Sequence, residues 1–200
     1  MKGSIVIVSF FILGLILGYG GWLPASMIEN DYTLYALCCL MFLVGAGIGS
    51  DKKLKQIVKS VNRKVLFVPL ATILGTFIGV IVVSFFLKDR SIADCLAVGS
   101  GFAYYSLSSV FITEFKGAEL GTIALMANIF RELIALLGAP LLVRYFGRYA
   151  PICAGGATTM DTTLPIITRY SGKDLVFVAI FHGAAVDFTV PFFVTFFCKL

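Results

Sequence analysis

Two carboxylates stand inside stretches of the sequence that are otherwise apolar. Asp161 lies in the middle of residues 151–168, and Glu132 lies in the middle of residues 119–143. A carboxylate at the centre of a lipid bilayer costs at least about 2.5 kcal/mol, so such residues are retained where they have a function or a partner. We therefore expect both acids to bind a cationic substrate, a proton or both.

The residues around Asp161 are unusual for a plain helix. Glycines weaken a helix and Pro165 removes a backbone donor, which favours a broken helix at membrane depth. Transporters use such discontinuous helices to build binding sites near the midplane. The threonine hydroxyls can hydrogen-bond either protonation state of a carboxylate. The candidate binding residues beside Asp161 are Gly155, Gly156, Thr158, Thr159 and Thr162.

Glu132 follows Arg131 directly, so one alternative is a charge-compensated structural pair. Successive helical residues point about 100° apart, however, and do not face each other along one helix. Asn128 precedes Glu132 by four residues and shares its face. We expect a polar stripe of Asn128 and Glu132, with Arg131 directed towards another helix or a partner.

Several weaker candidates accompany these residues. Asp187 and His182 lie in residues 174–198, five positions apart and therefore not on one face; His182 is expected to be a hydrogen-bonded interior histidine rather than a proton relay. Tyr104, Tyr105 and Ser106 either line a pocket or pack. One histidine and five cysteines without a C-x-x-C pair predict no metal, no cofactor and no disulfide framework.

The composition requires a lipid bilayer around these residues. The 200-residue chain is 59% hydrophobic and 14% charged, with a mean hydropathy of +0.98, and one soluble core cannot bury that much apolar surface. The net charge of +5 lies in short connectors, so nucleic acid is not an expected partner. We predict an all-α polytopic membrane domain with seven segments, at about 3–23, 32–49, 65–87, 92–113, 119–143, 151–168 and 174–198.

The basic connectors predict the orientation. Residues 51–64 carry six bases: Lys52, Lys53, Lys55, Lys59, Arg63 and Lys64. The positive-inside rule makes this loop cytoplasmic, which puts the N-terminus and residues 114–119 inside as well. Arg144 and Arg148 then fall on the outer side, against the rule. A re-entrant hairpin at 92–113 or 151–168 would move them, and the sequence leaves open whether these two segments span or re-enter.

Three motifs resemble the bacterial lysine exporter family, LysO: Gly-Phe-Ala-Tyr-Tyr-Ser-Leu-Ser-Ser at 101–109, Arg-Glu-Leu-Ile-Ala at 131–135, and Gly-Gly-Ala-Thr-Thr-Met-Asp-Thr-Thr-Leu-Pro at 155–165. The resemblance implies export of L-lysine across the bacterial inner membrane in exchange for protons, with Glu132 and Asp161 as the functional acids. It also implies a fold of inverted five-helix repeats, as in cation/proton antiporters. The third to seventh segments would form one repeat, and the sixth would be its broken crossing helix.

Two features depart from this resemblance. Typical members carry about three further helices before the first segment, which suggests the larger part of a split exporter with a small three-helix membrane partner. Asp187 stands where a small neutral residue is expected. Two alternatives stay open: an ion-coupled carrier of another small solute, and an intramembrane aspartyl protease using Asp161 and Asp187. The sequence lacks the G-x-G-D pattern of such proteases, so we expect no enzyme.

Overall fold

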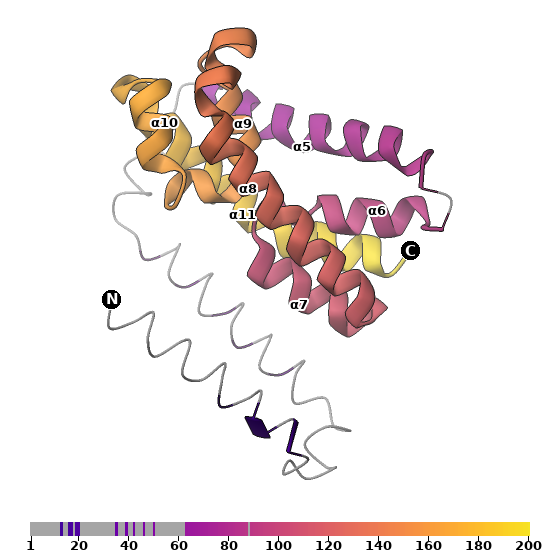
Figure 1. Ribbon diagram of the computed structural model, residues 1–200. Helices are drawn as coiled ribbons and strands as arrows, with labels where there is room; N and C mark the ends of the chain where they lie inside the picture. Colours follow the sequence, from indigo (N-terminus) through magenta and orange to yellow (C-terminus); the bar gives the residue numbers. More distant parts are fainter. Residues whose placement is uncertain are drawn as a thin grey trace. The chain divides into compact units, whose positions relative to one another are not determined.

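The computed structural model describes residues 63–87 and 89–200, together with a few scattered positions before residue 51. The first two predicted segments and most of the basic loop lie outside the described residues. Three long helices organise the described part: α5 (Arg63–Ser84), α8 (Ala118–Phe146) and α11 (Val176–Cys198) (Figure 1). All three are long and apolar enough to cross a membrane. The prediction of an all-α polytopic membrane protein is confirmed.

The fourth predicted segment is a helical hairpin. It consists of α6 (Ile92–Gly99) and α7 (Tyr105–Lys116), separated by a break at which Phe102 and Ala103 have positive φ angles of 44° and 72°. Lys116 Nζ lies 3.3 Å from Asp94 Oδ1, which joins the end of α7 to the start of α6. The chain therefore returns to the end of the bundle at which it entered.

The sixth predicted segment is a second hairpin. It consists of α9 (Ala150–Gly155), a 3-10 turn η1 (Gly156–Met160) and α10 (Leu164–Tyr170), followed by a short 3-10 turn η2 (Lys173–Leu175). Arg148, before α9, pairs with Asp174, after α10, and its Nε donates to the Ser171 carbonyl at 2.6 Å. Pro165 lies in the first turn of α10, where its missing donor costs nothing.

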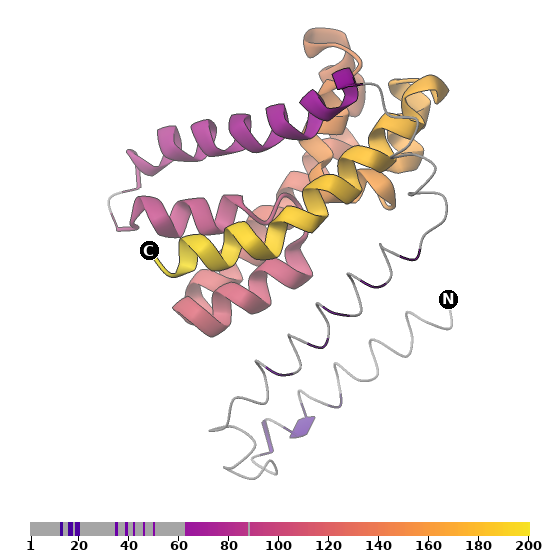
Figure 2. The same cartoon turned by 180° about the vertical axis from the view of Figure 1, so that it is seen from behind.

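The two hairpins enter from opposite ends and meet at their tips. The end that holds α9 and α10 also holds the start of α5, since Val65 packs against the cluster of Ile152 and Ile167 (Figure 2). At the junction the Ala157 amide donates to the Phe102 carbonyl at 2.8 Å. Each break thereby satisfies backbone groups of the other, as irregular backbone at membrane depth requires.

The two hairpins determine at which end of the bundle each connector lies. Because α6–α7 returns to its starting end, Arg144 and Arg148 lie at the same end of the bundle as Arg63. The expectation that residues 114–119 share that end is wrong, since the break at Phe102 reverses the chain. The resemblance implied one broken helix among these segments, and the described residues contain two.

Candidate functional site

The two acids singled out from the sequence are joined through one threonine. The Thr162 hydroxyl donates to Glu132 Oε1 at 2.5 Å, and the Thr162 amide donates to Asp161 Oδ1 at 2.5 Å. Glu132 comes from the middle of α8, whereas Asp161 and Thr162 lie in the break between η1 and α10. Asp161 and Thr162 are exposed and Glu132 is half-buried, so the Asp161 carboxylate is open to a ligand. We name Glu132, Asp161 and Thr162 the carboxylate cluster.

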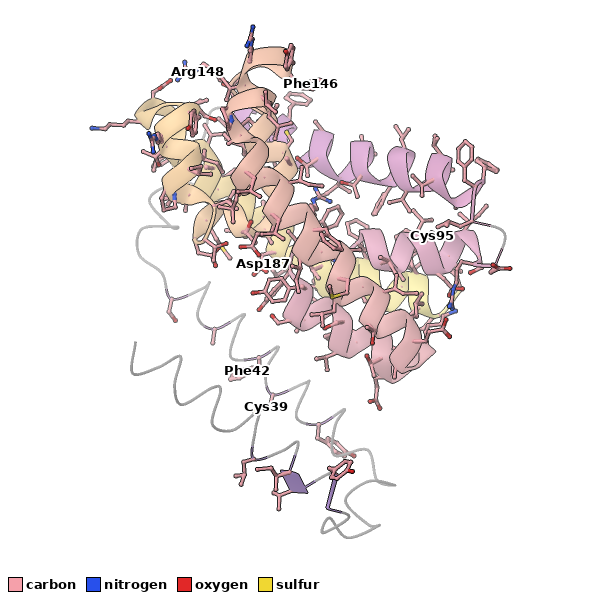
Figure 3. All side chains as sticks on the ribbon, viewed as in Figure 1. Cys39, Phe42, Cys95, Phe146, Arg148 and Asp187 are labelled. Carbon is pink, nitrogen blue, oxygen red and sulfur yellow. The ribbon has the colours of Figure 1, made fainter. Side chains whose placement is uncertain are left out.

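Asp187 and Tyr104 lie next to this cluster. Asp187, on α11, is 4% exposed and stands one turn after Gly183, where an added Cβ would lie 2.7 Å from the amide nitrogen of Met160, the residue before Asp161. Tyr104 precedes α7 and is half-buried within the fields of both aspartates. Figure 3 places Asp187 between Cys95 and Arg148, which lie at opposite ends of the bundle. The junction of the hairpins therefore gathers three carboxylates, and none of the ion pairs in the described residues involves them.

Asn128 supports the tip of the α6–α7 hairpin. Its Oδ1 accepts from the Ala103 amide at 2.8 Å, and its Nδ2 donates to the carbonyls of Val98 and Ala124 at 3.2 and 2.9 Å. The side chain is 3% exposed. Asn128 thus shares a helix face with Glu132, but its hydrogen bonds stabilise the break at Phe102–Ala103.

Arg131 points away from Glu132, as its position on the helix predicts. Its Nε donates to the Ala154 carbonyl at 3.0 Å and its Nη2 to the Cys153 carbonyl at 3.1 Å. Nη1 donates to Thr76 Oγ1 at 3.2 Å, and the guanidinium lies 5.6 Å from the Phe102 ring centroid. A cation beside the last carbonyls of α9 is favourable, because those carbonyls carry the negative end of the helix dipole.

His182 is fully buried and bridges three elements. Its Nε2 lies 2.8 Å from Thr72 Oγ1 on α5, and its Nδ1 lies 3.1 Å from Thr159 Oγ1 on η1. The Thr159 hydroxyl has carbonyl acceptors at Gly156 and Ala179, so its oxygen is available to accept from Nδ1. The expected interior, hydrogen-bonded histidine is what the structure shows.

The residues around Gly155 and Gly156 form the tip itself. A Cβ on Gly156 would lie 2.1 Å from the Phe102 carbonyl oxygen. The Gly156 amide donates to Ile152, and the Thr158 hydroxyl donates to the Gly155 carbonyl at 2.8 Å. The Gly156 amide is therefore engaged inside the protein.

The N-terminus of α7 offers other backbone donors. No side chain caps this helix at Tyr104, whereas α6 has a complete capping box at Ser91. Tyr105 is half-buried and Ser106 is exposed in its first turn. Because uncapped first-turn amides carry the positive end of the helix dipole, this turn can attract an anion. In the described residues no three His, Cys, Asp or Glu side chains are grouped for a metal ion.

Comparison with known proteins shows to which family the sequence belongs. The chain is 35% identical to the lysine exporter LysO of Escherichia coli over 97% of its own length and 64% of the relative, so it spans about two thirds of that protein. It is 34% identical to a putative lysine exporter of Haemophilus influenzae, over 96% of both chains. No solved structure matches. Residues 8–198 match the family described as lysine exporter LysO, and the chain belongs to that family.

Proposed function

We propose that this protein exports L-lysine across the bacterial inner membrane by exchange for protons. The observation that carries the proposal is the carboxylate cluster, in which Glu132 and Asp161 from separate elements meet through Thr162. The cluster lies beside the junction of two opposed broken segments, where transporters place their substrate sites. The names of the two relatives supply the substrate.

The chemistry of lysine fits this junction. Lysine carries two ammonium groups and one carboxylate at neutral pH. The carboxylates of Glu132 and Asp161 bind an ammonium group by charge-assisted hydrogen bonds. The uncapped first turn of α7, at Tyr105 and Ser106, lies on the Tyr104 side of the same junction and attracts the substrate carboxylate.

Exchange follows from competition for the same carboxylates. A proton and an ammonium group each neutralise a carboxylate, so the binding of one weakens the binding of the other by the same factor. Lysine binds from the cytoplasm when Asp161 and Glu132 are charged. Protons arriving from outside displace it, and their release inside resets the site.

The positive-inside rule gives the orientation. Arg63, Arg144, Arg148 and Lys173 gather at the end of the bundle that holds the α9–α10 hairpin, which makes that end cytoplasmic. The two spans predicted before residue 51 would put the N-terminus on the same side. The connector at Arg144 and Arg148, which opposed the rule under seven simple spans, agrees with it once 92–113 is a hairpin.

We propose that this chain acts with a small three-helix membrane partner, as the resemblance of its motifs to the family suggests. Co-purification from native membranes should recover it. Full transport in liposomes by this chain alone would show that no such partner is needed.

Toxicity of thialysine, a lysine analogue, tests the transport function in cells that lack their own lysine efflux. The chain, expressed with its proposed partner, should restore resistance, and Asp161→Asn and Glu132→Gln should abolish it. The matched control is Glu114→Gln, because Glu114 is an exposed acid on α7 outside the carboxylate cluster. Resistance in the Asp161→Asn variant equal to that of the unchanged protein would refute the assignment.

The alternative function, an intramembrane aspartyl protease, would use Asp161 and Asp187 as its catalytic pair. Asp161 and Asp187 do lie within each other's field, as a dyad requires. The family name points to a transporter rather than to an enzyme. We expect the purified protein to leave transmembrane peptides intact, and cleavage that Asp187→Asn removes would reverse this preference.

A further inference from the structure

Asp187 lies on the face of α11 that contacts the second hairpin. One turn earlier on this face is Gly183, where an added Cβ would lie 2.7 Å from the Met160 amide nitrogen and 2.9 Å from the Ala157 carbonyl oxygen. Residues four apart share a helix face. Asp187 therefore lies on the face of α11 that contacts η1, one turn beyond Gly183. Asp161 directly follows η1, so the two carboxylates lie near each other, in agreement with the electrostatic effect of Asp161 on Asp187.

Asp187 differs from the other two acids in its surroundings. Glu132 and Asp161 each accept a hydrogen bond from Thr162. Asp187 is 4% exposed, yet no described residue donates a hydrogen bond or an ion pair to it. A deeply placed carboxylate with no donor among the described residues is stabilised by a bound proton or cation.

The groups around Asp187 favour a cation. Asp161 approaches from the break after η1 and Tyr104 from the tip of the other hairpin. On α11 itself, His182 is engaged by hydroxyls of α5 and η1. Asp94 of α6 and Lys116 of α7 pair with each other at the far end of that hairpin, where Glu114 is exposed. On α8, Arg131 is turned to the carbonyls of α9.

We propose that Asp187, together with Asp161, forms a second cation subsite, which takes the second ammonium group of the substrate. The inference rests on the proposed function and specifies its substrate class as diamino acids. Glu132 and Thr162 lie on the α8 side of Asp161, and Asp187 lies on the α11 side. One ammonium group binds on each side.

This arrangement explains selectivity against ordinary amino acids. Norleucine has the six-carbon chain of lysine but lacks the terminal ammonium group, so its side chain ends in a methyl group. Bound in the same site, norleucine would leave Asp187 buried and unpaired. Sites that leave a buried polar group unpaired reject a substrate analogue far more strongly than sites that lose only apolar contact.

The test is lysine transport in proteoliposomes that contain the chain with its proposed partner. Asp187→Asn keeps the size of the side chain and removes its charge. We expect the KM for lysine to rise about 10- to 100-fold, as for loss of one hydrogen bond to a charged group. Norleucine, a poor competitor of the unchanged protein, should compete more strongly in the variant. Glu114→Gln should change neither quantity.

Three results would overturn the inference. The first is an unchanged KM for lysine with unchanged norleucine competition. The second is an unchanged KM with loss of the pH dependence of transport, which would make Asp187 a proton carrier. The third is a wild-type protein that moves no lysine, which would also overturn the proposed function, whereas the first two leave that function standing. Asp187→Ser provides the same comparison if Asp187→Asn does not fold.

Discussion

Gly156 is the position at which the meeting of the two hairpins is most sensitive to a single added atom. Its φ is 61°, in a region that side chains rarely adopt, and a Cβ would lie 2.1 Å from the Phe102 carbonyl oxygen. The same carbonyl accepts the Ala157 amide at 2.8 Å. Gly156→Ala therefore strains the backbone and pushes apart the two tips at once.

The size of the effect follows from these two contributions. A residue other than glycine in a sparsely populated backbone region costs about 1–3 kcal/mol. Separation of the tips leaves the Ala157 amide buried without its acceptor, which costs about 1–3 kcal/mol more. The sum is roughly 2–6 kcal/mol, a large share of the about 5–15 kcal/mol that stabilises a typical domain.

Gly138→Ala is the matched control. Gly138 lies inside α8, where the nearest atoms to an added Cβ are side-chain carbons 3.9 Å away. Alanine in a helix interior gains about 0.5–1 kcal/mol over glycine, so this variant should unfold at the same or higher denaturant concentration. Reversible unfolding in detergent measures both variants. A Gly156→Ala protein with the unfolding midpoint of the unchanged protein would refute the tip-to-tip contact.

Three further predictions address other parts of the bundle. An impermeant thiol reagent, applied to variants in an otherwise cysteine-free background, should label Arg90→Cys and Lys116→Cys from one side of the membrane and Arg148→Cys from the other; labelling of the first two from opposite sides would exclude the hairpin. Arg131→Gln should lower the free energy of unfolding by about 1–3 kcal/mol, because it leaves partly buried carbonyls of α9 without their donor. His182→Asn should lower stability in the same assay but retain lysine transport, and a loss of transport with unchanged stability would make His182 a functional residue instead.

The sequence predicted the helical class and the two acids because both depend on the cost of polarity in lipid. Asp161 and Glu132 stand out in apolar segments whatever their partners are. The clustering of glycine and threonine likewise predicted that residues 151–168 form no plain helix. The direction that the chain takes after a break could not be predicted in this way. It depends on contacts such as Lys116–Asp94, which join residues of the two arms and leave no periodic pattern.

The supporting residues were also harder to predict. Asn128 was assigned to the binding face because it shares a helix face with Glu132, but its partners lie in the break 25 residues earlier. Thr72 and Thr76 of α5 were not singled out, although they hydrogen-bond His182 and Arg131. Hydroxyls at four-residue spacing in an apolar helix were the available signal. No sequence signal indicated the positive φ angles of Phe102 and Ala103, because neither residue type favours that conformation.

Arg131 and Glu132 connect this architecture to the proposed exchange. They are neighbours on α8, yet they hold opposite arms of the same hairpin: Arg131 binds the carbonyls that end α9, and Glu132 accepts from Thr162 just before α10. The contact of Arg131 does not change with protonation, because a guanidinium stays charged. The contact of Glu132 does change, since a charged carboxylate accepts a stronger hydrogen bond than a neutral one. In the proposed exchange, replacement of a proton by lysine at Glu132 would therefore change the strength of the contact to one arm of the hairpin, whereas the Arg131 contact to the other arm would stay the same.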